Sequence, residues 1–94
     1  MGTILRGLVS ECLSNFSEDK LVAVLREAHH VLGDGRKVHG LFCDMWKVLF
    51  PNGTLDDRKA MYARVLLMAN LPTKNYGKAV TKADVFSRLD ALGV

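Results

Sequence analysis

The sequence predicts an all-α fold, a compact irregular bundle of about five short helices in a single domain over residues 1–94. Two segments have the Thr-x-x-Asp pattern of a capping box, in which each of the two side chains binds a backbone N–H group at the helix start. These boxes are Thr54 with Asp57 and Thr81 with Asp84. Elsewhere apolar residues recur three and four positions apart, which is typical of amphipathic helices, and no segment has the alternation of a strand.

The first two predicted helices cover about residues 4–15 and the segment from Ser17 to Gly33. In the first helix the apolar residues share one face. Ser17 is a favourable N-cap for the second helix, and Glu18 and Asp19 suit the positive end of its dipole. The second helix is expected to end at Gly33, because glycine commonly follows a helical C-terminus.

The third predicted helix, about residues 36–50, is apolar around most of its circumference. Only a narrow polar line interrupts the apolar surface, formed by Lys37, Gly40, Asp44 and Lys47. A helix with so little polar surface lies in the middle of a bundle or against a partner. We therefore expect this helix to be the central one.

The fourth predicted helix begins after Thr54 and ends at Pro72, which cannot continue a helix. Its outer face becomes apolar toward the C-terminal end, so the following loop or another molecule should cover it. Residues 73–80 have the composition of a loop. The fifth predicted helix covers about residues 82–92, with Gly93 just past its end.

The packing expected of these helices places the fourth beside the third, and the fifth closes one side of the bundle. The predicted core consists of apolar residues from the buried stripe of each helix. These residues are Leu8, Leu25, Leu41, Phe42, Met45, Leu49, Val65, Phe86 and Leu89.

Composition limits the class of protein without defining its activity. The 94 residues are 49% hydrophobic and carry a formal net charge of +3, with Lys and Arg outnumbering Asp and Glu after residue 35. No signal peptide is predicted, since Arg6 interrupts the first apolar stretch, and no apolar run approaches the ~20 residues of a membrane span. Cys12 and Cys43 make no disulfide framework, and we expect both to be reduced in a cytoplasmic protein.

A zinc site is the metal-binding arrangement that the sequence offers. His39 and Cys43 are four residues apart, so both would project from one helical face, and His29 and His30 lie in the preceding helix. His39 and Cys43 also lie in an apolar stripe beside Trp46, where isolated His and Cys are more often core residues. We therefore predict no metal and no cofactor. Since most carboxylates lie at helix starts or on outer faces, we also predict no enzymatic activity.

The hydrophobic fraction is high for so small a domain, so some apolar surface should face a partner. The residues expected there are Trp46, Phe50, Leu67 and Leu71, and tryptophan is a common interface anchor. The predicted function is a small non-enzymatic protein-binding module, an adaptor, inhibitor or regulator of a larger protein that acts through helical surfaces. Self-association as a homodimer is a second way to cover the same surface.

The alternative is a small basic regulator that binds DNA or RNA. Its contacts would come from the start of the third helix and from the C-terminal segment, through Arg36, Lys37, Lys74, Tyr76, Lys78, Lys82 and Arg88. Cations neutralise phosphates, and a tyrosine ring can stack on a base. Asp84 and Asp90 share the fifth helix, however, and alternating charges on a helix are usually a solvated face.

Overall fold

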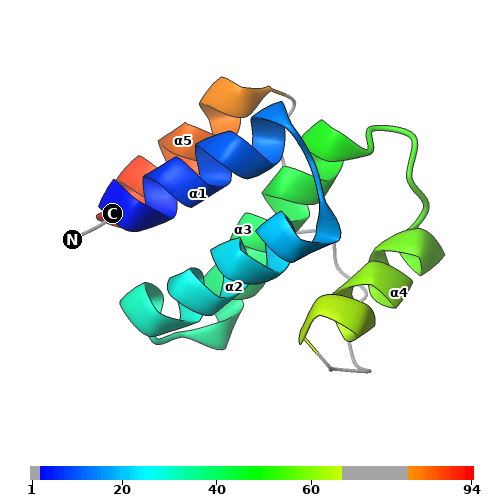
Figure 1. Cartoon of the computed structure of the whole chain (residues 1–94), viewed down its shortest axis with the longest axis horizontal. Helices are drawn as coiled ribbons and strands as arrows, with labels where there is room; N and C mark the ends of the chain where they lie inside the picture. The colour runs from blue at the N-terminus through cyan, green and yellow to red at the C-terminus, as the bar shows by residue number, and fades with distance from the viewer. Residues whose placement is uncertain (1–2, 67–80) are drawn as a thin grey trace.

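The computed structural model describes residues 3–66 and 81–94, and these residues form a bundle of five α-helices without strands (Figure 1). The helices are α1 (Thr3–Ser14), α2 (Glu18–Leu32), α3 (Gly35–Leu49), α4 (Leu55–Leu66) and α5 (Lys82–Ala91). This architecture confirms the predicted fold class. None of these described helices is long and apolar enough to cross a membrane.

The helix α3 is central, as predicted, because residues 38–46 are all buried and the helix packs against α1, α2 and α5. In Figure 1, α3 passes behind α2 and behind the connection from α1 to α2, and α5 lies beside α1. Arg6 of α1 donates to the carbonyl oxygen of Val94 at 2.9 Å and pairs with Asp90 of α5, which holds the start of α1 against the C-terminus. The helix α4 packs mainly against α2, so its predicted place beside the third helix is wrong. It reaches α3 through the side chain of Tyr62, which contacts Phe42.

The helix starts follow the capping signals in the sequence. The Ser17 hydroxyl accepts a first-turn N–H of α2 at 3.1 Å. Thr54 and Asp57 bind each other's backbone N–H groups at 3.1 Å, and Thr81 and Asp84 do the same at 3.4 and 2.9 Å. Both predicted capping boxes are confirmed, and they fix where α4 and α5 begin.

The connection between α2 and α3 is short, and each of its residues caps one of the two helices. Gly33 adopts a φ of 65°, in the left-handed region that favours glycine, and donates its N–H to the His29 carbonyl at 3.0 Å. Asp34 is the N-cap of α3, a role that was not predicted for it. Its carboxylate accepts the Arg36 N–H at 2.9 Å, so only the two cap residues, Gly33 and Asp34, separate the end of α2 from the start of α3.

The core lies between α3 and the surrounding helices. Six of the predicted core residues are buried: Leu25, Leu41, Phe42, Met45, Val65 and Leu89. The core also contains buried residues at helical spacing from α1, α2 and α5: Leu5, Val9, Cys12, Leu21, Val24, Ala28 and Val85. The apolar stripes therefore face inward as their periodicity predicts.

The prediction is wrong for three residues. Leu8, Leu49 and Phe86 are only partly buried and pack on the outside of the core. In α1 the inward direction is centred on Leu5 and Val9, which leaves Leu8 at the edge of the stripe. Phe86 is likewise one position beyond a buried residue of α5, and Leu49 is the last residue of α3. Periodicity identifies a face but does not fix its centre to within one residue.

The polar line predicted for the third helix is also partly wrong. Gly40 and Asp44 are buried, because the Arg88 side chain of α5 crosses α3 there and pairs with the Asp44 carboxylate. Gly40 makes room for this crossing, since a Cβ atom at that position would lie 2.8 Å from Nη1 of Arg88. The polar residues of this line thus form a contact between helices, while Lys37 and Lys47 keep some solvent exposure.

Candidate functional site

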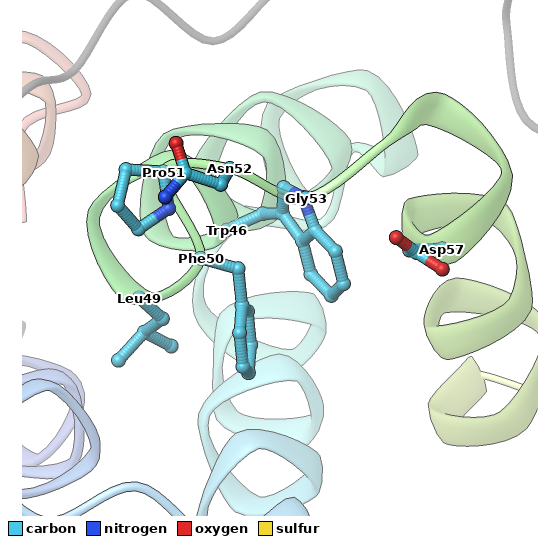
Figure 2. A pocket seen from close by; sticks show the side chains of 7 residues that line it. All are labelled: Trp46, Leu49, Phe50, Pro51, Asn52, Gly53 and Asp57. Carbon is cyan, nitrogen blue, oxygen red and sulfur yellow. The ribbon is translucent and has the colours of Figure 1, made fainter.

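A shallow pocket of about 420 Å³ lies where α3 turns into α4 (Figure 2). Its lining residues are Trp46, Leu49, Phe50, Pro51, Asn52, Gly53 and Asp57. A second hollow of about 330 Å³ adjoins the pocket and shares four of these residues. It is lined by Trp46, Lys47, Phe50, Pro51, Gly53, Thr54, Leu55 and Arg58. We call residues 46–58, which supply both linings, the α3–α4 corner.

The sequence builds this corner by stopping one helix and capping the next. Phe50 ends α3 and donates its N–H to the Trp46 carbonyl at 2.7 Å. Pro51 has no N–H group to continue the helix, and the Gly53 N–H closes a turn onto the Phe50 carbonyl at 2.9 Å. Thr54 then caps α4 through its box, so the backbone on both sides of the pocket is held by hydrogen bonds.

Aromatic rings form the wall of the pocket. The centre of the Trp46 ring lies 4.5 Å from the centre of the Phe50 ring and 6.1 Å from the centre of the Phe42 ring in the core. Phe50 in turn makes an edge-to-face contact with Phe16 at 5.1 Å. Figure 2 shows the Trp46 and Phe50 rings side by side, with Asp57 of α4 facing the indole. The wall is therefore stiff, because each of its rings is packed on another.

Gly53 is required by the close approach of the chain to this indole. A Cβ atom at Gly53 would lie 2.9 Å from both Cζ2 and Nε1 of Trp46. The indole cannot easily move aside, since it is only 7% exposed and is packed between other rings. The turn and the aromatic wall thus depend on each other.

The residues predicted to face a protein partner differ in how exposed they are, and two of the four lie outside the described part of the chain. Trp46 lines the pocket with a small exposed edge, and its indole is largely part of the core. Phe50 is half-buried and lines both hollows. Leu67 and Leu71 lie outside the described residues. Among the described residues, Leu55 at the second hollow is one of the exposed large hydrophobic side chains, at 40%.

The basic residues of the alternative prediction are only partly described. Arg36 and Lys37 are exposed, and the backbone N–H of Arg36 donates to the Asp34 carboxylate at 2.9 Å. Lys82 is exposed and donates to the Ser14 hydroxyl at 3.1 Å. The remaining residues of this prediction, Lys74, Tyr76 and Lys78, lie outside the described residues.

Arg88 is the basic residue whose place differs most from the prediction. It was expected to contact phosphate from an exposed helix face. Its guanidinium instead pairs with Asp44, whose side chain is 4% exposed, while the Arg88 side chain itself is 29% exposed. Arg88 therefore has a structural role between α5 and α3.

The His39 and Cys43 pair lies in the core, as the sequence analysis favoured. Cys43 Sγ is 3.4 Å from His39 Nε2, and the imidazole packs edge-to-face on Tyr62 with ring centres 5.4 Å apart. His29 and His30 are exposed on α2. In residues 3–66 and 81–94 no three His, Cys, Asp or Glu side chains gather as metal ligands would.

Burial shifts the pKa values of several groups near this core. It lowers the pKa of His39 below the ordinary value of 6.5, and the nearby Arg58 guanidinium lowers it further. Burial raises the pKa of Tyr62, and the nearby Cys43 raises it further. Burial also raises the pKa of the Cys12 thiol to about 11. At the corner, the Thr54 backbone N–H lowers the pKa of Asp57 by donating to its carboxylate. The core groups therefore favour their neutral forms at neutral pH.

The lowered pKa of His39 makes stability depend on pH. Unfolded His39 binds a proton as the pH falls through 6.5, whereas the folded protein resists protonation until a lower pH. The melting temperature should therefore fall between pH 7.5 and 5.5, as followed by circular dichroism under buffer conditions of about equal ionic strength. The variant His39→Leu should show a flatter profile over this range. His29→Leu, at an exposed position, is the control and should keep the wild-type slope.

Comparison of the chain with protein-family models, curated proteins and solved structures finds no match. The function is therefore inferred from the chemistry of this chain's own residues. Within the described part of the chain, the α3–α4 corner brings an apolar pocket, an exposed leucine and charged side chains together.

Proposed function

We propose that this chain is a small non-enzymatic protein-binding module, an adaptor, inhibitor or regulator of a larger protein, and that it binds through the α3–α4 corner. The observation that supports this function is the pocket beside Trp46 and Phe50, which opens at the surface and has apolar walls. Aromatic side chains are enriched at the centres of protein interfaces. An apolar side chain of a partner would remove this surface from water.

The stiffness of the corner favours binding. Ordering a flexible surface on association costs roughly 0.5–1.5 kcal/mol for each immobilised side chain. Here Phe50 is already held by Trp46 and Phe16, and the turn is held by its own hydrogen bonds. Most of this ordering is complete before a partner arrives, so a small pocket can still contribute useful affinity.

Self-association belongs to the same proposal. Ile4, near the start of α1, is 66% exposed, and the N-terminus of the chain lies on the side of the molecule opposite α4 in Figure 1. A second copy of the chain could use either this residue or the corner as its contact. The two contacts are distinguished by which backbone amide resonances shift as the protein concentration is raised.

Peptide selection followed by NMR mapping tests the proposed function. Peptides selected from a random display library against the folded protein should shift the backbone amide resonances of residues 46–58 in ¹⁵N-labelled protein. The helix α1, which supplies no lining residue to either hollow, provides the internal control, and its resonances should stay unchanged. Peptides that shift α1 or α5 but not the corner, or a library from which no peptide is enriched, would contradict the proposal.

Binding of DNA or RNA is the second candidate, because Arg36, Lys37 and Lys82 are exposed. Its signature is salt dependence, since phosphate binding releases counterions and weakens steeply as salt rises, whereas apolar contacts do not. Fluorescence anisotropy with labelled duplex DNA and single-stranded RNA distinguishes the two functions. Steeply salt-dependent binding would favour this second candidate, and no binding at low salt would remove it.

A further inference from the structure

Charged side chains surround the α3–α4 corner unevenly. The second hollow is lined by Lys47 and Arg58, and no carboxylate is among its lining residues. Asp57 lines the first pocket instead, and its carboxylate accepts the Thr54 N–H at 3.1 Å. Asp56 is exposed on the first turn of α4 but lines neither hollow. The corner therefore has an apolar pocket with a cationic hollow directly beside it.

The position of Lys47 strengthens its effect on a ligand. Lys47 is half-buried, so part of its charge lies at the edge of a low-dielectric interior, whereas Arg58 is 5% exposed and interacts with other groups of the protein. Interactions between charges are stronger there than in open water. The aromatic edge of Trp46 and the exposed Leu55 complete the hollow, which makes it suitable for a side chain that follows an apolar anchor.

We infer that the partner contributes an acidic and apolar segment to this corner, with an aliphatic or aromatic side chain beside Trp46 and Phe50 and a neighbouring carboxylate at Lys47. This inference rests on the proposed function, and charge complementarity carries it. The two hollows share Trp46, Phe50, Pro51 and Gly53, so the apolar and acidic groups belong to adjacent residues of the partner. The net charge of +3 also attracts an acidic segment over longer distances.

A pair of charge-swapped peptides tests the inference. The probes are acetyl-Gly-Asp-Leu-Phe-Glu-Gly-amide and the same peptide with lysine in place of its two acidic residues. Trp46 is the single tryptophan of the chain and lines both hollows, so its fluorescence reports their occupancy. At low ionic strength the acidic peptide should bind about fivefold or more tightly than the basic one. This comparison uses the wild-type protein and depends on no variant.

Two variants then locate the charge effect. Lys47→Glu should reverse the preference between the peptides, while Lys37→Glu should keep it, because Lys37 is exposed at the far end of the same helix and lines neither hollow. Circular dichroism checks that both variants fold. Equal binding of the two peptides, or an unchanged preference in Lys47→Glu, would overturn the inference and leave the proposed function standing. If neither these probes nor the selected peptides reach the corner, the inference and the proposed function both fail.

Discussion

Replacing Phe42 with alanine is expected to lower the free energy of unfolding by about 3–5 kcal/mol. Phe42 is fully buried in α3 and its ring contacts those of Trp46 and Tyr62, so truncation removes apolar burial and leaves a cavity between helices. Domains of this size are stable by only about 5–15 kcal/mol in total. The variant should therefore lie close to the limit of folding at room temperature.

Urea unfolding followed by circular dichroism measures this loss. The matched control is Phe86→Ala, which removes the same side chain from a half-buried position on α5. Its cost should be clearly smaller, since solvent already contacts part of the ring. A loss for Phe42→Ala no larger than that for Phe86→Ala would contradict the central place of α3 in the core.

Replacing Arg88 with methionine is expected to cost about 3–5 kcal/mol as well, for a different reason. Methionine keeps much of the apolar stem of the side chain but removes the cation beside the Asp44 carboxylate, which is 4% exposed. A buried charge that loses its ion-pair partner bears much of its desolvation cost uncompensated. The loss should come from this charge, because the methionine side chain can still pack over Gly40, where the Arg88 side chain crosses α3.

Two comparisons separate the charge from the packing. Adding Asp44→Asn to Arg88→Met should recover part of the loss, since the double variant no longer has the buried carboxylate. Arg64→Met breaks the ion pair between Arg64 and Glu18, whose two side chains are 56% and 41% exposed, respectively. It should lower the free energy of unfolding by only about 0–1 kcal/mol. Equal losses for Arg88→Met and Arg64→Met would show that the buried pair contributes no more than a surface one.

The helices could be predicted because their signals are local. Thr54 with Asp57 and Thr81 with Asp84 are three residues apart, so each box acts within a single turn and does not depend on the rest of the fold. The left-handed φ of Gly33 likewise needs only the residues next to it. Local hydrogen bonding and backbone preference thus determine where these elements begin and end.

Contacts between distant segments could not be predicted in the same way. Asp44 and Arg88 are 44 positions apart, and a charged residue on an otherwise apolar helix gives no sign of which element will meet it. Gly40 is compatible with a close approach of another segment, but a glycine does not identify the group that approaches. Leu8 and Phe86 were misplaced because the centre of an apolar face depends on the neighbouring helices.

The candidate site was predicted by residue type more than by position. Trp46 and Phe50 were expected to face a partner because the hydrophobic fraction is high for so small a domain, and both residues line the corner. The depth of Trp46 depends on its packing against Phe42 and on the turn that brings Gly53 against the indole, neither of which periodicity describes. The cationic hollow beside it arises only when α4 folds back and places Arg58 near Lys47.

Binding of the selected peptides to Phe50→Ala tests the central claim most directly. Phe50 is half-buried and lines both hollows, so its removal should weaken binding about tenfold or more, equal to about 1.4 kcal/mol, while the helices remain folded. Phe86→Ala removes the same side chain away from the corner and should leave the affinity unchanged. If Phe50→Ala binds the peptides as tightly as the wild-type protein does, the α3–α4 corner is not the binding surface.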